Sequence, residues 1–178
     1  VEELNGLIQE ILDFRKAEDA GFSHTHIRRV SVSSLLRTQF EWFYPLSEQH
    51  QIQFKIDAPK ELYWNTDSVY FKKILANLIS NAFKYTEDGG TVRISLHEEE
   101  NFLVLKVYNT GKGIEEADMQ NIFDRYRILG TMDNDDNRQN TTRNGLGLFI
   151  CHSLVQSLGG KINIESEVGQ YAEFTVTL

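Results

Sequence analysis

The chain begins with an apolar stripe at helical spacing. Its members are adjacent or lie three or four residues apart, and they are Val1, Leu4, Ile8, Ile11 and Leu12. Because such spacing places side chains on one side of an α-helix, we predict a helix over residues 1–16 that needs a partner surface. Residues 17–29 are polar, contain Gly21 and show no periodicity, which is typical of a linker.

A second helical pattern follows the linker. Its apolar positions are Leu35, Leu36, Phe40, Phe43 and Leu46. Ser33 or Ser34 is available as the N-cap, and Pro45 falls near the end of the helix. Residues 51–56 then alternate polar and apolar side chains, which predicts a half-buried strand.

A long helical segment comes next. Its apolar positions recur with the period of a helix and are Phe71, Ile74, Leu75, Leu78, Ile79 and Ala82. Thr66 and Asp67 are good N-caps, and the glycine pair at 89–90 ends the helix after Tyr85. We predict that the apolar side of this helix faces a sheet.

Strand patterns dominate the rest of the chain. Residues 91–96 and 102–108 are strand-like and flank the acidic segment 97–101, which predicts a hairpin. Residues 115–123 favour a short helix. The chain closes with a helical pattern at Ile150, Leu154, Val155 and Leu158, a Gly159-Gly160 turn, and strands over residues 161–165 and 172–178.

The order of these elements predicts an α+β fold. We expect residues 30–178 to form a two-layer α/β sandwich, with a mixed sheet of about five strands and helices on one face. Residues 124–144 are polar with few apolar anchors. A loop of that length inside a compact domain is often a lid over a site.

Composition and charge exclude several kinds of partner. With 178 residues and 40% hydrophobic content, the chain is long enough for one globular domain plus a short appendage. A net charge of −8 repels a phosphate backbone, so no nucleic acid is expected as a partner. Apolar runs such as residues 102–105 are too short to span a membrane. The single cysteine, Cys151, rules out an internal disulfide and is interpreted as a small buried apolar residue.

The long helix carries two asparagines where an exposed face normally carries charges. Asn77, Asn81 and Lys84 lie at i, i+4 and i+7 and project together. Asparagine forms helices less well than Glu, Lys, Gln or Arg, so the amides cost helix stability. An amide oxygen can ligate Mg²⁺, Lys84 can meet phosphates, and Tyr85 offers a flat ring to a base. The pattern indicates a nucleotide and metal site, although two such asparagines are more often incidental surface residues.

Two glycine motifs strengthen this interpretation. Residues 109–114, NTGKGI, follow a predicted strand, and residues 144–148, NGLGL, precede a predicted helix. Glycine lets a backbone approach a ligand closely, and the N–H groups of a helix N-terminus suit phosphate. Each motif alone is often only a tight turn. Together with the asparagine helix and an intervening lid, they are hard to explain as chance.

At these motifs the chain resembles the Bergerat-fold ATPases, which include DNA gyrase, heat-shock chaperones and sensor histidine kinases, and it looks most similar to the kinases. The resemblance extends over roughly residues 30–178. Its segments are NLISNAFKYT for the N box, VYNTGKGI for the first glycine box, IFDRY for the F box and NGLGLFICHSLVQSLGGKINIES for the second glycine box.

The resemblance implies that this domain binds ATP with Mg²⁺. It assigns Asn81 as the Mg²⁺ ligand, and Asn77 and Lys84 as catalytic residues that orient and meet the phosphates. The other residues that it implies at the nucleotide are Tyr85, Asn109, Gly111, Gly113, Ile114, Phe123, Arg127, Gly145, Leu146, Gly147 and Leu148.

The resemblance also implies individual roles for several of these residues. Tyr85 would lie against adenine, and Phe123 would anchor the base of the lid over residues 124–144. Gly145 and Gly147 would offer N–H groups to phosphate oxygens. Candidate phosphate contacts in the lid are Arg125, Arg127 and Arg143.

Transfer to a histidine, rather than hydrolysis, is the activity that the resemblance implies. Hydrolytic members place a glutamate where Asn77 stands, and an amide cannot act as a general base for water. The implied partners are a dimerisation and phosphoacceptor domain of the same protein, which forms a homodimer, and the receiver domain of a response regulator. The implied location is the cytoplasmic part of a membrane-anchored sensor, with residues 1–16 as the end of a dimerisation helix.

The chain departs from the family pattern at several positions. Asn109 replaces an aspartate that accepts the adenine amino group, and Arg143 and Tyr171 stand where glycines are common. No histidine carries the acceptor signature, so this piece is not expected to phosphorylate itself. These departures leave open the alternative that the chain is a degenerate nucleotide-binding or scaffolding module without transfer activity. An ATPase or serine-directed kinase on the same fold is disfavoured by Asn77.

Overall fold

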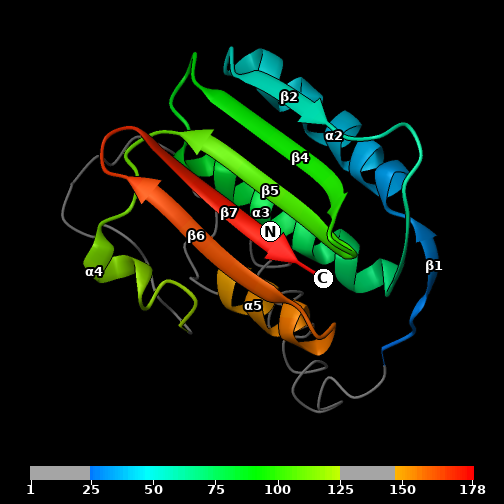
Figure 1. Ribbon diagram of the computed structural model, residues 1–178. Helices are drawn as coiled ribbons and strands as arrows, with labels where there is room; N and C mark the ends of the chain where they lie inside the picture. Colours follow the sequence, from blue (N-terminus) through cyan, green and yellow to red (C-terminus); the bar gives the residue numbers. More distant parts are fainter. Residues whose placement is uncertain (1–24, 125–146) are drawn as a thin grey trace, which may run out of the picture.

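The computed structural model describes residues 25–124 and 147–178 of the chain, and a five-stranded sheet forms its centre (Figure 1). The strands are β2 (Gln53–Asp57), β4 (Thr91–Glu99), β5 (Phe102–Thr110), β6 (Lys161–Glu167) and β7 (Tyr171–Thr177). Their order is β2-β4-β5-β7-β6; β2 and β4 are parallel and the other pairs antiparallel. The mixed sheet predicted from the sequence is confirmed.

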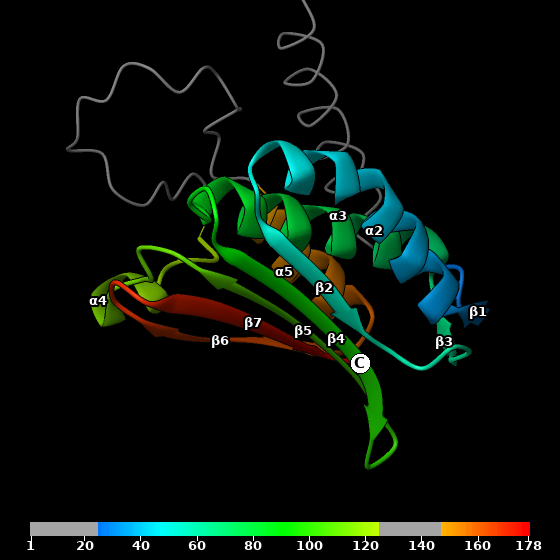
Figure 2. The same ribbon diagram turned by 90° about the horizontal axis from the view of Figure 1, so that it is seen from above.

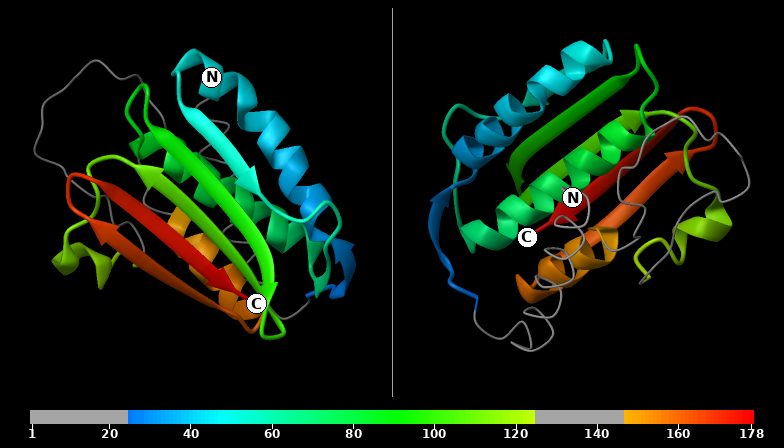
Figure 3. Two further views of the ribbon diagram at one scale, coloured as in Figure 1. Left: turned by 45° about the horizontal axis from the view of Figure 1, so that its top comes forward. Right: turned by 180° about the vertical axis from the view of Figure 1, so that it is seen from behind.

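Three helices cover one face of this sheet. They are α2 (Val32–Gln49), α3 (Ser68–Tyr85) and α5 (Gly147–Ser157). Figure 2 shows all three on the same side of the strands, and the rear view in Figure 3 shows them in front of the sheet, running roughly along the strands. A short helix, α4 (Glu116–Met119), lies near the turn between β6 and β7. The predicted two-layer arrangement is therefore confirmed.

The core lies between α3 and the central strands. Every apolar position predicted for the inner side of α3 is buried, and Phe71, Ile74, Leu75, Leu78 and Ile79 are fully buried. Along β4 and β5 alternate residues point toward the helices, so the inward side chains are apolar and buried. The inward residues of the two strands are Val92, Ile94, Leu96, Leu103, Leu105 and Val107.

Asn109 interrupts this apolar series. It occupies the next inward position of β5 after Val107, and only 5% of its surface is exposed. A buried amide is stabilised only when it has hydrogen-bond partners. Asn109 therefore marks the place where the core gives way to a polar environment at one end of the sheet.

The N-terminus of α3 is held by Asp67. One carboxylate oxygen of Asp67 accepts hydrogen bonds from the N–H groups of Val69 and Tyr70, at 2.9 and 3.1 Å. The other oxygen accepts from the N–H of His26 at 2.8 Å, although the side chain is almost completely buried. The predicted N-cap is thus confirmed, and it also joins the chain entering the domain to the helix.

A second, smaller sheet was not predicted. Strand β1 (Arg28–Ser31) pairs antiparallel with β3 (Tyr63–Thr66), so the chain becomes a strand within the segment 17–29 that the sequence favours as a linker. Both strands are short, and neither β1 nor β3 shows a run of buried alternate residues. Their sequences therefore carry no period-two signal.

The cap of α2 differs from the prediction. Ser31 is the N-cap and accepts from the N–H of Ser34. Ser33 is instead fully buried, where its hydroxyl accepts from the N–H of Leu62 at 2.9 Å and donates to the carbonyl of Lys60 at 3.4 Å. The predicted cap at Ser33 or Ser34 is wrong because β1 brings the chain into the helix earlier.

The β4–β5 hairpin is longer than predicted. The strands continue through the acidic residues predicted as a turn, and only Glu100 and Asn101 separate them. Both residues have positive φ, at 49° and 69°, as a two-residue hairpin turn requires. The short helix is smaller than the predicted range 115–123, since α4 covers only Glu116–Met119.

The cysteine and the membrane predictions can also be compared with the structure. Cys151 is buried in α5, and burial raises the pKa of its thiol, in agreement with a structural apolar role. Among the helices in the described part of the chain, none is long and apolar enough to cross a bilayer.

Asp67 offers a test of the helix cap. Asp67→Ala removes the acceptor for three main-chain N–H groups and is expected to lower the free energy of unfolding by about 2 kcal/mol. Asp67→Asn retains an amide oxygen that can cap the helix, so a loss of about 1 kcal/mol or less is expected. Urea unfolding followed by circular dichroism measures both, and equal losses would contradict a capping role.

Candidate functional site

The C-terminal half of α3 and the first turn of α5 meet at Asn77. The amide nitrogen of Asn77 donates to the carbonyl of Lys73 at 2.9 Å, which fixes the orientation of the side chain. Its Oδ1 then faces Gly147, the first residue of α5, because a Cβ added at Gly147 would lie 3.0 Å from this oxygen. The structure therefore brings together two site residues predicted from distant motifs, next to the N-terminus of a helix.

The other predicted residues of α3 follow Asn77 along the helix. Asn81 is half-buried and lies one turn further on. Lys84 and Tyr85 are exposed in the last turn, and the ammonium nitrogen of Lys84 lies 5.2 Å from the centre of the Tyr85 ring. A positive charge is favourable there because the helix dipole is negative at the C-terminus.

Residues 111–114, here called the glycine loop, leave the end of β5 and pass through a narrow space. Gly111 has φ +155°, and a Cβ at this residue would collide with the carbonyl oxygen of Tyr85 at the end of α3. Gly113 has φ +66°, and a Cβ there would collide with the carbonyl oxygen of Glu167. Only glycine permits the loop to pass between α3 and the β6–β7 turn.

Hydrogen bonds tie the glycine loop to the β6–β7 turn. The N–H of Gly111 donates to the carbonyl of Gln170 at 3.1 Å, and the N–H of Gly169 donates to the carbonyl of Lys112 at 2.7 Å. At the far end of the loop, the N–H of Ile114 donates to the hydroxyl of Ser166 at 2.8 Å. The sequence motif identifies the glycines but gives no sign of Ser166, which lies on β6.

Asn109 lies beside the glycine loop. Its amide nitrogen donates to the carbonyl of Thr110 at 3.1 Å and would lie 3.6 Å from a Cβ placed at Gly111. Because the amide nitrogen bonds to the main chain, the amide oxygen is the end of the group left to accept a hydrogen bond from a ligand. The pair Asn109 and Gly111 thus forms a polar corner next to the end of α3.

Phe123 connects the segment after α4 to the rest of the domain. Its ring stacks on His152 of α5, with ring centres 5.2 Å apart, and meets Phe174 of β7 edge-on at 6.4 Å. Leu148 of α5 is partly buried against the core. Three predicted nucleotide contacts, Arg127, Gly145 and Leu146, lie outside the described residues, as do the lid arginines Arg125 and Arg143 and residues 125–144 of the predicted lid.

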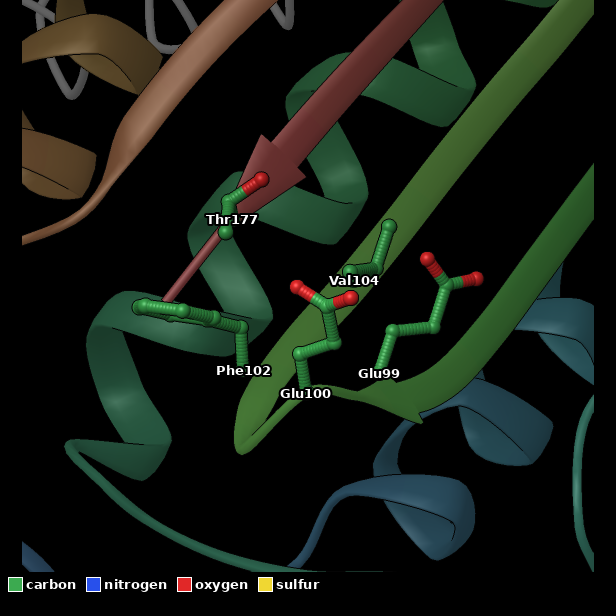
Figure 4. Close-up of a pocket in the computed structure, with 5 residues that line it drawn as sticks. All are labelled: Glu99, Glu100, Phe102, Val104 and Thr177. Carbon is green, nitrogen blue, oxygen red and sulfur yellow. The ribbon is translucent and has the colours of Figure 1, made fainter.

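A hollow at the tip of the β4–β5 hairpin is remote from this site. Figure 4 shows its lining residues, which are Glu99, Glu100, Phe102, Val104 and Thr177. The hollow lies at the Phe102 end of β5, whereas Asn109 and the glycine loop lie at the Thr110 end. The two ends are about 26 Å apart at the rise of a strand. Within the described ranges, no group of three His, Cys, Asp or Glu side chains could hold a metal ion.

The sequence matches the family model described as "Histidine kinase-, DNA gyrase B-, and HSP90-like ATPase" over residues 66–178. It is 34% identical over 178 residues to the circadian input-output histidine kinase CikA of Synechococcus elongatus. That match includes 98% of this chain but only 23% of CikA, so the chain spans about a quarter of the length of this relative.

Solved histidine kinases share the fold. The catalytic domain of ThkA superposes with a TM-score of 0.74 and 24% identity, over 86% of this chain and 95% of that domain. Full-length ShkA in complex with AMPPNP superposes with a TM-score of 0.80 and 24% sequence identity, over 98% of this chain and 35% of ShkA. ThkA in complex with the response regulator TrrA superposes with a TM-score of 0.76 and 20% sequence identity, over 99% of this chain and 48% of ThkA. At these identities the likeness establishes the fold alone.

The space around the glycine loop gives a test of its packing. Gly113→Ala is expected to lower the free energy of unfolding by about 3 kcal/mol or more, because both the positive φ and the contact with Glu167 oppose a side chain. Gly159→Ala is the matched control, since Gly159 has φ +75° but nothing within 4 Å of an added Cβ. For the control we expect about 1 to 2 kcal/mol. Chemical denaturation compares the two, and similar losses would contradict the close approach.

Proposed function

The chain belongs to the family of histidine kinase-, DNA gyrase B- and HSP90-like ATPases, and it is the ATP-binding catalytic domain of a two-component sensor histidine kinase. We propose that it donates the γ-phosphoryl group of ATP to a histidine on a dimerisation domain. The observation that carries the proposal is the meeting of Asn77 with Gly147. This places an amide side chain and the N-terminus of α5 around one point.

That point suits the phosphates of ATP. The first N–H groups of a helix have no partner within the helix and carry the positive end of its dipole, so they bind anions. Gly147 has no Cβ, which lets the first turn of α5 approach the Asn77 side chain closely. Lys84 supplies a positive charge on the same helix as Asn77.

Mg²⁺ fits the chemistry of the neighbouring amides. Asn81 follows Asn77 by one helical turn, so both side chains project on the same side of α3. A single amide oxygen suits Mg²⁺, which usually keeps several waters and takes substrate phosphates as its other ligands. When bound, the ion neutralises phosphate charge. We propose Asn81 as its protein ligand and Asn77 as the residue that orients the phosphates.

Asn109 and Tyr85 suit the base. The orientation of the Asn109 amide leaves its oxygen to accept from the amino group of adenine, whereas the carbonyl at the same position of guanine is itself an acceptor and cannot donate. The exposed ring of Tyr85, at the end of α3, offers a flat apolar surface. We propose that the main chain of the glycine loop, which includes Gly111, Gly113 and Ile114, lies beside the base next to Asn109.

The reaction needs positioning rather than a general base in this domain. In the proposed step a neutral imidazole nitrogen of the acceptor histidine attacks the γ-phosphorus, the bond from phosphorus to the β–γ bridging oxygen breaks, and ADP leaves with that electron pair. An amide at Asn77 cannot deprotonate water, so hydrolysis is slow. The proposed ATP complex therefore persists until the histidine arrives.

The proposal extends to the partners and to the rest of the chain. We propose residues 1–16 as the end of a dimerisation helix, the segment between that helix and β1 as a linker, and the chain from β1 to residue 178 as the catalytic domain. The acceptor histidine then belongs to the dimerisation domain of a homodimer, and the phosphoryl group passes on to a response regulator, the class of partner present in the ThkA complex. In a membrane-anchored sensor this domain would lie on the cytoplasmic side.

Calorimetric titration of ATP with and without Mg²⁺ tests the site. Binding that depends on Mg²⁺ is expected, with GTP much weaker, and Asn81→Ala should weaken it by about tenfold or more, because the ion loses a ligand. Asn163→Ala is the control, since Asn163 is exposed on β6. Absence of ATP binding by the intact chain would favour a scaffolding module instead.

Phosphoryl transfer is tested separately. The chain is mixed with radiolabelled Mg-ATP and a dimerisation hairpin from a histidine kinase that carries the acceptor histidine and is known to accept phosphate. Acid-labile label should appear on the hairpin, and Asn77→Ala should slow its appearance by about tenfold or more. Steady release of phosphate without the hairpin, or an unlabelled hairpin despite bound ATP, would count against a histidine kinase.

A further inference from the structure

We propose that Ser166, outside the residues expected to touch ATP, is a positioning residue for the nucleotide site. It acts through Ile114 and holds the glycine loop, residues 111–114, in the shape that receives the base. The inference rests on the proposed function, since it assigns the loop to the nucleotide. The hydroxyl, which lies on β6, fixes the far end of the loop before ATP arrives.

The hydroxyl of Ser166 makes two directed hydrogen bonds. It accepts from the N–H of Ile114 at 2.8 Å and donates to the carbonyl of Tyr171 at 2.6 Å. The second bond fixes the direction of the hydroxyl hydrogen, so a lone pair is left to face Ile114. Ser166 therefore connects the loop to the start of β7 through a single oxygen atom.

Ile114 depends on this oxygen. Its surface is 9% exposed, and its N–H donates to Ser166. A buried N–H without a partner is unfavourable by about 1 to 3 kcal/mol. Removing the hydroxyl therefore favours loop shapes in which the N–H of Ile114 turns toward water.

Close packing of Gly111 and Gly113 and two main-chain hydrogen bonds also restrain the loop. Its remaining main-chain bonds to the turn are those from Gly111 to Gln170 and from Gly169 to Lys112. Both lie at or before Lys112, whereas the bond from Ile114 to Ser166 holds the far end of the loop. The loop also contains two glycines, which have the largest backbone freedom when released. Loss of one bond therefore increases the disorder of the end nearest the F-box segment.

The consequence falls on ligand affinity. A loop that is already ordered adds no ordering cost to binding, whereas a loop that must be ordered by ATP subtracts that cost from the affinity. Ser166 does not need to touch the nucleotide to have this effect. Removal of the Ser166 hydroxyl should therefore lower nucleotide affinity more than removal of a hydroxyl that makes similar hydrogen bonds elsewhere in the domain.

Ser33 provides that comparison. Its hydroxyl also accepts from a main-chain N–H, that of Leu62, and donates to a main-chain carbonyl, that of Lys60. Ser33 is fully buried in the first turn of α2, beside the β1–β3 sheet and away from the glycine loop. Ser33→Ala therefore reproduces the chemical change of Ser166→Ala without the connection to Ile114.

The experiment measures Mg-ATP affinity by calorimetry for Ser166→Ala, Ser166→Thr and Ser33→Ala, with urea unfolding of each. Ser166→Ala is expected to weaken ATP binding by about three- to tenfold. Ser166→Thr keeps the hydroxyl and should restore affinity to within about twofold. Ser33→Ala should lower the unfolding midpoint while leaving ATP affinity unchanged.

Amide hydrogen exchange gives a second measurement that needs no variant. In the unliganded wild-type chain, the N–H of Ile114 should already be protected, because its bond to Ser166 exists before ATP binds. An Ile114 amide that exchanges as fast as an exposed one, and becomes protected only with ATP, would overturn the proposal even if Ser166→Ala failed to fold.

The remaining outcomes separate this inference from the proposed function. If the wild-type chain does not bind Mg-ATP, the proposed function fails. If it binds, but Ser166→Ala binds equally well or Ser33→Ala weakens binding by the same factor, the positioning role is wrong and the ATP site stands. A folded Ser166→Thr that binds as weakly as Ser166→Ala would also overturn the role of the hydroxyl.

Discussion

The burial of one side of α3 against β4 and β5 determines where the rest of that helix points. Its inner side chains are fully buried, and each contributes about 1.5 to 3 kcal/mol when removed from water. The helix therefore cannot rotate without exposing them. Asn77, Asn81 and Lys84 are held on another side, where Asn77 meets the first turn of α5. The chemistry of the site is in this sense a consequence of the apolar core.

The end of α3 also limits the path of the chain on the opposite side of the site. Gly111 passes so close to the carbonyl of Tyr85 that no side chain fits, and Gly113 passes as closely to Glu167. The glycines of the first motif are thus required by packing between two elements, whatever the loop binds. The same glycines can serve both packing and ligand binding, because the close packing places the loop backbone beside Asn109.

Much of the fold could be predicted because it depends on periodic burial. The inner side of α3 and the alternating residues of β4 and β5 repeat with their own periods, and Asp67 is a cap that local chemistry reveals. Strands β1 and β3 were missed because they are short and lack that alternation. Ser166 was missed for another reason. Its hydrogen-bond partner, Ile114, is 52 residues away in the sequence, and the residues around a serine on a strand do not indicate so distant a partner. The roles of the individual site residues remain predictions.

The carboxylate of Asp67 has a mechanical consequence. It accepts from the main chain at His26, which leads into the domain, and from the first turn of α3. The entering backbone and the helix therefore share one rigid joint, and neither can shift without straining or breaking bonds to a buried anion. A helix transmits displacement along its axis, and Asn81 lies about 21 Å from this joint. A load applied to the chain ahead of β1 would thus reach the N-terminus of α3 directly through Asp67.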